Sequence, residues 1–366
     1  MSIYIITLLI CLLISMVAYQ TVYVQPMNNY NCLDLNHRYK RLFIIIAVFM
    51  LLVVGLRADV IGIDTLNYKN TFHVIGRQDF SFLNSYEWYQ ESGYAFVIIL
   101  FNKLGLSWQV YAVFMAALFI IPIMVLIFKN TDNCFFALTI FIMCGLWTYP
   151  MSTMRQAAAI GLTVIAFMFE DKKRNLLCLL FICIASLFHI SALLVLVYFV
   201  VRKVSVTKQG FLVWFVAGIL IVGIGIGPLR NILAEIMVFF GRDYQNYDLT
   251  GGLWQELFFI ASLGIGWFFG QDGDERYWKY YKAIFLSAVL LPIVRINPAL
   301  FRIYTYFSVY EVLFVPLMLS KIDQRMIKVI GYMGYFGVYL YLFFTQSVAN
   351  SLKVTPYMFF WMRGVL

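Results

Sequence analysis

Charged and titratable side chains are rare in this sequence, and those at the ends of its apolar segments fall into five groups. Only 12% of the 366 residues are charged, whereas 63% are hydrophobic. An ionisable group in hydrocarbon is costly unless it is paired or hydrated, so each group is a candidate functional site. The groups are Arg57 with Asp59 and Asp64, Glu91, Arg155, His189, and Arg295 with Arg302. A topology based on loop charge places all five groups on one side of a membrane, and this convergence predicts a site for an anionic, lipid-linked substrate.

The first group combines an anion-binding residue with potential bases. Arg57 ends an apolar segment, where a guanidinium can bind two phosphate oxygens at once. Asp64 follows Gly62 and Ile63 in a loop, and its carboxylate can serve as a general base toward an acceptor hydroxyl. A structural alternative has equal weight, in which Arg57 snorkels to the interface and pairs with Asp59.

Glu91 and Arg155 each precede a segment with helical character. Glu91 opens a short apolar stretch, 93–104, whose positive N-terminal end suits a phosphate, although Glu91 can instead simply cap this helix. Arg155 is followed by small residues that allow helices to approach closely. We expect Arg155 at the extracytoplasmic end, against the positive-inside tendency, which favours a functional role over an anchoring one.

His189 stands at the apex of two short apolar helices that together run over 175–201. A polar break at membrane depth commonly faces a cavity. As imidazolium the side chain would bind a diphosphate, and as imidazole it would accept a proton. The alternative is a buried neutral histidine whose hydrogen bond is satisfied by Ser191.

Arg295 and Arg302 lie in one short turn that contains a proline, which predicts an anion clamp.

The hydrophobic pattern predicts an all-α, polytopic membrane protein in which residues 1–366 form one domain. Runs of roughly 18 or more apolar residues are typical of spanning helices. We expect about 12 spanning helices, with 93–104 as an additional re-entrant helix. The apolar segments are roughly 2–24, 40–56, 109–128, 134–149, 156–169, 175–188, 190–201, 211–227, 253–270, 277–294, 303–320 and 327–345.

The charge distribution sets the expected topology. The formal net charge is +9, but the basic residues are spread over short connecting loops, which indicates the positive-inside pattern rather than a nucleic-acid surface. Placing these loops in the cytoplasm puts both termini outside. It also gives two external segments, 57–92 and 228–252, that carry part of the site.

The six cysteines show neither a disulfide framework nor zinc-ligand spacing.

These residues resemble the EpsG family within the Wzy-type polysaccharide polymerases. The resemblance rests on five motifs in order and covers roughly residues 1–320, whereas 354–357 match less clearly. The motifs are Gly55-Leu56-Arg57, Gly62 to Tyr68, Glu91 to Tyr94, Arg155-Gln156, and His189 to Ser191. Each motif alone is weak, and the occurrence of five in order is what makes the resemblance specific.

The resemblance implies a C-type membrane glycosyltransferase that works without metal or cofactor. Its donor and acceptor would be polyprenyl-diphosphate-linked oligosaccharides, joined into a surface polysaccharide on the outer face of the bacterial cytoplasmic membrane. Membrane lipid and a regulator of chain length are further expected partners, and nucleic acid is not. Direct displacement by the acceptor would invert the anomeric centre.

The resemblance and the residue chemistry together assign roles to twelve side chains. The residues expected to bind the donor diphosphate are Arg57, Arg155, Arg295 and Arg302. The residues expected to take part in catalysis are Asp64, Asp59, Glu91 and His189, with Asp64 favoured as the base. The residues expected to contact sugar are Tyr68, Tyr94, Gln156 and Trp88, although an interfacial aromatic belt is the alternative for aromatic residues such as Trp88.

Three other functions fit parts of the pattern. A flippase for the same lipid-linked glycan would share the hydrophobicity and the cationic site, but it would show repeated halves with discontinuous helices, and no such symmetry is visible. An O-antigen ligase would share the donor chemistry and differ in acceptor. A membrane O-acyltransferase is disfavoured because His189 would then have to face the cytoplasm.

Overall fold

The computed structural model describes residues 2–23, 39–86, 91–131, 133–170, 174–203, 253–270, 273–291, 301–350 and 352–362. Within these ranges the chain forms helices and no strand, apart from an isolated bridge between Arg57 and Phe359. The predicted all-α class is therefore confirmed. The chain divides into two compact units, Met1–Ala192 with Met326–Leu366, and Leu193–Arg325. A single membrane domain and its number of spanning helices stay predictions.

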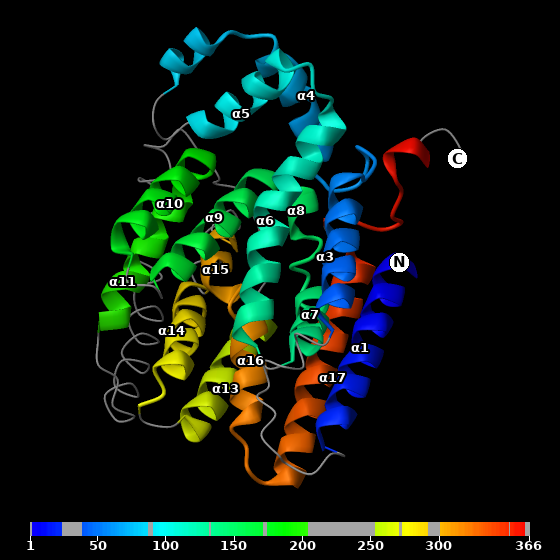
Figure 1. The fold of residues 1–366 in the computed structure, drawn as a ribbon, viewed down its shortest axis with the longest axis vertical. Helices are drawn as coiled ribbons and strands as arrows, with labels where there is room; N and C mark the ends of the chain where they lie inside the picture. Colours follow the sequence, from blue (N-terminus) through cyan, green and yellow to red (C-terminus); the bar gives the residue numbers. More distant parts are fainter. Residues whose placement is uncertain are drawn as a thin grey trace. The chain divides into compact units, whose positions relative to one another are not determined.

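The first unit contains most of the helices and is centred on α6 (Trp108–Asn130), which packs against α3 (Lys40–Gly55) and α9 (Met154–Glu170) (Figure 1). Its other elements are α1 (Ser2–Tyr23), α4 (Thr65–Gly76), η1 (Phe80–Ser85), α5 (Ser92–Lys103), α7 (Cys134–Met143), α8 (Tyr149–Ser152), α10 (Asn175–Phe188), η3 (Ile190–Leu194), which reaches the unit boundary, α17 (Arg325–Ala349) and η6 (Phe360–Met362).

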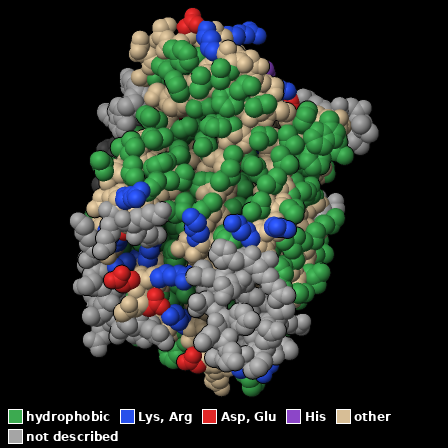
Figure 2. Space-filling model, viewed as in Figure 1, with side chains coloured by type: hydrophobic (Ala, Val, Ile, Leu, Met, Phe, Trp, Pro, Cys, Tyr) green, Lys and Arg blue, Asp and Glu red, His purple; other side chains and the backbone are tan. Residues whose placement is uncertain are grey.

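Several helices present apolar side chains outward, as helices facing lipid do. Among the described residues, Trp108–Asn130 and Arg325–Thr345 are long and apolar enough to cross a membrane, and seven shorter apolar helices accompany them. On α3, Ile45 is 63% exposed, and Ile44 and Val48 are exposed beside it. Hydrophobic side chains cover much of the described surface in Figure 2. Such apolar exposure is uncommon in monomeric soluble proteins.

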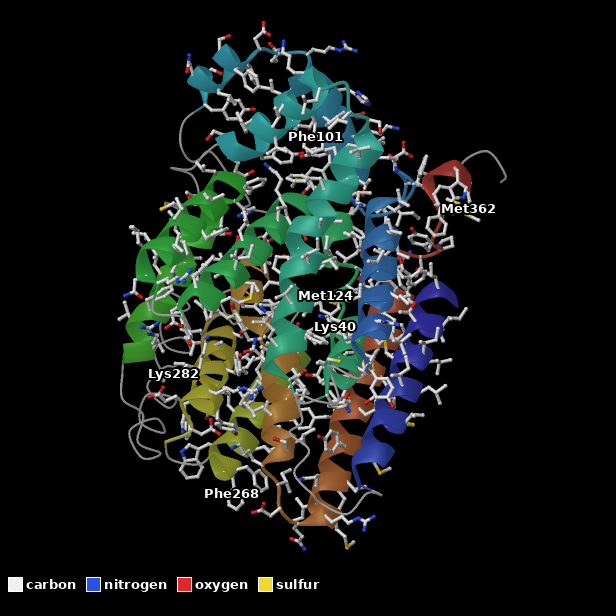
Figure 3. All side chains as sticks on the ribbon, viewed as in Figure 1. Lys40, Phe101, Met124, Phe268, Lys282 and Met362 are labelled. Carbon is white, nitrogen blue, oxygen red and sulfur yellow. The ribbon has the colours of Figure 1, made fainter. Side chains whose placement is uncertain are left out.

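The predicted external segment 57–92 contains two helical elements that the hydrophobic pattern did not predict, α4 and η1. In Figure 1, α4 and α5 lie together beyond the upper end of α3. The buried Tyr111 of α6 contacts rings from both, Phe72 of α4 and Phe101 of α5, at centroid distances of 5.0 and 5.6 Å. Phe101 is labelled in Figure 3. Aromatic packing thus fixes the α4–α5 pair on α6.

Two predicted segments are shorter or broken. The segment predicted over 134–149 ends as a helix at Met143, because Gly145 adopts a φ of +78°, the left-handed conformation that commonly follows a helix C-terminus. In the second unit the segment predicted over 303–320 forms two helices, α15 (Phe301–Ser308) and α16 (Glu311–Ser320). The predicted segment 211–227 lies outside the described residues.

The second unit also contains α11 (Val195–Lys203), α13 (Leu253–Phe269) and α14 (Glu275–Leu290). Buried tyrosines of α14 bond to the backbone of α13: the Tyr281 hydroxyl donates to Leu263 O at 3.0 Å. Asp274 caps α14 and pairs with Lys321 at 2.5 Å. Burial acts to raise the pKa of Asp274, but the hydrogen bonds from Lys321 and from the Tyr277 N–H outweigh burial and lower it.

The contact between α6 and α9 depends on a glycine. A Cβ atom added at Gly161 would lie 1.8 Å from the carbonyl oxygen of Leu118 and 2.9 Å from the Cα of Phe119. Both neighbours are backbone atoms, so no side-chain rotation can relieve the overlap. Small residues allow this close approach between membrane helices.

Replacing Gly161 by alanine should therefore destabilise the fold, by about 2 kcal/mol or more, since α6 and α9 must separate. The matched control is Gly334→Ala in α17, where an added Cβ meets nothing within 4 Å. Thermal unfolding of the two purified variants in detergent measures the difference. An equal melting temperature for Gly161→Ala and the wild-type protein would show that the described α6–α9 contact is wrong.

Candidate functional site

Three segments of the first unit meet at the carboxylate of Glu91, the residue immediately before α5. Its side chain is 2% exposed and forms an ion pair with Arg155 Nη1, at the start of α9. On the other side, His189 Nε2 lies 3.9 Å from Glu91 Oε1. Thus three of the five groups singled out in the sequence come together around one buried negative charge.

Local backbone structure places these groups. Glu91 adopts the left-handed conformation, with a φ of +65°, which is uncommon for a residue with a side chain. Two residues later, Gly93 allows α5 to begin against α10, because a Cβ there would lie 2.7 Å from the Cβ of Leu187. The α10 helix ends at Phe188 and His189 is extended, which confirms the predicted break.

Arg155 is the most accessible member of the cluster, with 31% of its side chain exposed. Its guanidinium lies over two tyrosine rings, 5.4 Å from the centroid of Tyr94 and 5.9 Å from that of Tyr68, in the geometry of cation–π contacts. A guanidinium carries five N–H donors, and Nη1 of Arg155 donates to the carboxylate of Glu91. Arg155 can therefore bind an oxyanion while it stays oriented by Glu91 and the rings.

His189 is buried and has a close polar neighbour on its own segment. The residue is 5% exposed, and its Nδ1 lies 2.6 Å from the hydroxyl oxygen of Ser191. Ser191 is half-buried. The contact between His189 and Ser191, which was the alternative interpretation of His189 from sequence, is therefore present. His189 also lies close to Glu91, which the sequence did not predict.

Arg57 has a different environment. Its side chain is almost fully buried, at 2% exposure, and all three of its nitrogens donate within the protein. Nη1 bonds to Val54 O at 2.5 Å, Nη2 to Met151 O at 3.2 Å and Nε to the Thr65 hydroxyl at 3.3 Å. Arg57 therefore connects the end of α3 with α8 and with the start of α4.

The segment 352–362 holds the loop that begins at Arg57, a relation that no local sequence pattern indicated. Backbone hydrogen bonds join Ala58 N to Met358 O and Gly62 N to Lys353 O, both at 2.9 Å. Gly62 has a φ of +90°, which favours glycine. In Figure 3 this segment, which runs to the labelled Met362, lies beside the upper end of α3.

The other predicted site residues fall in separate environments. Asp59 is buried and pairs with Lys69 at 2.8 Å, rather than with Arg57 as the structural alternative expected. Asp64 is half-buried at the start of α4. Gln156 is buried and accepts a hydrogen bond from the Tyr149 hydroxyl at 2.7 Å.

The remaining predicted site residues are not fully described. Trp88 and Arg295 lie outside the described residues. Of Arg302 only the backbone is described, in α15 of the second unit.

The EpsG family model matches residues 40–359, which include the Glu91 cluster, the Arg57 loop and most of the segment that holds it. The chain belongs to the EpsG family. This is a family of Wzy-type polysaccharide polymerase-like membrane proteins. The membership confirms the resemblance from residue 40 onward and extends it from about residue 320 to residue 359, whereas residues 1–39 lie outside the match. It also supports a polymerase-like role in exopolysaccharide biosynthesis. No curated protein and no solved structure matches the chain.

Replacing Arg57 should destabilise the protein, even when the charge is kept. In Arg57→Lys the ammonium cannot reach three acceptors in the fork geometry of a guanidinium, so buried carbonyls lose donors and unfolding becomes easier by about 3 kcal/mol. The control is Arg77→Ala, at an exposed arginine that follows α4. Folded yield and melting temperature after membrane extraction measure the effect. A stable but inactive Arg57→Lys protein would instead favour the diphosphate-binding role predicted from sequence.

Proposed function

We propose that this EpsG-family protein is a membrane glycosyltransferase that joins polyprenyl-diphosphate-linked oligosaccharide repeats into a polysaccharide. The observation that supports this most directly is the cluster itself: a partly exposed arginine beside a buried carboxylate and a histidine. Anion binding and proton acceptance are the two tasks that glycosyl transfer from a lipid diphosphate requires. The reaction would take place on the outer face of the cytoplasmic membrane, where we expect this end of the bundle from the charge pattern.

In this proposal Arg155 binds the donor diphosphate. As the anomeric C–O bond breaks, negative charge develops on the leaving oxygen, and a preorganised cation lowers the free energy of that transition state. The ion pair with Glu91 and the two tyrosine rings hold Arg155 in place before substrate arrives. Arg295 and Arg302 are assigned to the same diphosphate from the sequence alone. Cationic side chains, rather than a metal, carry this role.

The acceptor sugar hydroxyl must lose its proton as it attacks the anomeric carbon. We assign this proton to the Glu91–His189 pair, because Glu91 pairs with Arg155 and His189 lies beside Glu91. A single displacement of this kind inverts the anomeric centre. Of the predicted sugar-contacting residues, Tyr68 is half-buried beside Arg155, and we assign it the sugar nearest the diphosphate.

Arg155→Ala should abolish polymer while the protein remains folded. The expected loss is about 10²- to 10³-fold in polymerisation rate, the usual effect of removing one group that stabilises developing charge. The measurement is a gel of surface glycan from a strain that lacks this protein, complemented with wild type, with Arg155→Ala or with Arg77→Ala as the exposed control. Membrane immunoblots establish equal expression.

The same gel separates polymerase from the flippase alternative. Single-repeat material in the deletion strain, with a full ladder restored by wild type and Arg77→Ala only, supports the proposal. Complete loss of surface glycan, with lipid-linked repeats accumulating inside the cell, would support transport instead. A normal ladder from well-expressed Arg155→Ala would remove Arg155 from the mechanism.

Glu91→Gln should also reduce polymerisation by about 100-fold or more, since it keeps the size of the side chain but removes the charge that orients Arg155 and His189. The matched control is Asp79→Asn. The Asp79 carboxylate accepts a hydrogen bond from Lys103, which lowers its pKa, yet the pair is exposed and such pairs contribute little to stability.

Asp64→Asn in the same assay distinguishes the two candidate bases. Asp64 is the base favoured from sequence, and it has no hydrogen bond to the N-terminal backbone of α4. A larger loss in Asp64→Asn than in Glu91→Gln would assign the acceptor proton to Asp64 and restrict Glu91 to orienting Arg155.

A further inference from the structure

The hydroxyl of Ser191 lies beside the ring of the buried His189 and belongs to a residue that is less buried than the histidine. His189 is 5% exposed, so its ring has almost no surface through which to contact a sugar hydroxyl. Ser191, two residues later, is half-buried, and its oxygen lies 2.6 Å from His189 Nδ1. A proton can therefore reach the histidine through Ser191 more readily than directly.

The neighbours of the ring determine which nitrogen carries the proton in the neutral histidine. Nε2 faces the carboxylate of Glu91, with 3.9 Å between Nε2 and Oε1, so the attraction between a carboxylate and an N–H dipole favours a hydrogen on Nε2. Nδ1 then presents a lone pair and accepts the hydrogen bond from the Ser191 hydroxyl. The position of one proton on the ring thus sets the direction of the Ser191 hydrogen bond.

We infer that Ser191 is the residue that contacts the acceptor hydroxyl, and that it passes the proton to His189. This inference rests on the proposed glycosyl transfer. The acceptor O–H bond breaks and its proton moves to the Ser191 oxygen, while the original Ser191 proton moves to His189 Nδ1. The acceptor oxygen forms the new bond to the anomeric carbon, and the electron pair of the broken C–O bond leaves with the diphosphate.

The remaining groups of the cluster support this sequence of transfers. The proton shift leaves His189 as an imidazolium, and the carboxylate of Glu91 stabilises its positive charge. Arg155, on the other oxygen of Glu91, stays oriented toward the leaving diphosphate. The imidazolium later gives its proton to solvent through Ser191, and the cluster returns to its starting state.

A direct test is the tautomer of His189 in the full-length protein in lipid nanodiscs. The chain has three histidines, so His37→Asn with His73→Asn leaves His189 as the single one, and ¹⁵N-histidine NMR at alkaline pH reports its two nitrogens. We expect the hydrogen on Nε2, and we expect Ser191→Ala to shift the resonance of Nδ1. A neutral ring with its hydrogen on Nδ1 would overturn the inference, because Nδ1 could not then accept a proton from Ser191.

Activity provides the second test, with purified protein and lipid-linked repeats as substrate. Ser191→Ala should slow polymerisation by about 100-fold or more, whereas Ser191→Thr keeps a hydroxyl and should stay within about 10-fold of wild type. The control is Ser186→Ala. The hydroxyl of Ser186 donates to Cys183 O at 2.7 Å within α10. Undiminished activity of Ser191→Ala overturns the inference. If folded wild type makes no polymer, the proposed function fails, and the NMR measurement still decides the proton position.

Discussion

The buried carboxylate of Glu91 is the constraint on which the site depends. A charge with only 2% of its side chain exposed requires a partner, because an uncompensated ion in the interior costs several kcal/mol. Arg155 from α9 supplies that partner, and His189 after α10 approaches from the other side. The ends of three helices are thereby fixed relative to one another by electrostatics rather than by apolar packing alone. The left-handed backbone at Glu91, at a cost of about 1 kcal/mol, is offset by these contacts.

Two arginines with similar sequence contexts have different environments. Arg57 and Arg155 both stand at the boundary of an apolar segment, and both are natural ligands for phosphate. The Arg57 nitrogens donate to two carbonyl oxygens and a hydroxyl, and the side chain is buried. Arg155 is partly exposed. Breaking hydrogen bonds that a side chain already makes inside a protein costs free energy. Arg155 is therefore better suited than Arg57 to bind and release a ligand.

The sequence predicted local features well. Apolar runs located most of the described helices, the polar break at His189 is present, and α5 begins at Ser92 as the Glu91 motif suggested. Long-range partners were harder to predict. Met151 O, which accepts from Arg57, lies 94 residues away, and the carbonyl that bonds to Gly62 N belongs to Lys353. Backbone acceptors of this kind can come from any residue type, so they leave no periodic or compositional trace in the chain.

The spacing within the family motifs follows from the packing of the site. In the Glu91 motif, the carboxylate enters the cluster, Gly93 allows contact with Leu187, and Tyr94 lies under Arg155. In the next motif, Arg155 is partly exposed whereas its neighbour Gln156 is buried against Tyr149. In the third, His189 is buried and Ser191 is half-buried.

Each of these motifs thus combines a charged or titratable residue of the cluster with a neighbour that makes a packing or hydrogen-bonding contact. A shift of one residue along a helix rotates a side chain by about 100°, which would turn Arg155 away from Glu91 and place Gln156 there instead. An amide in that position would not neutralise the carboxylate. The site therefore constrains the register of the helices as much as the identity of their side chains, and this is why short motifs far apart in the chain can specify it together.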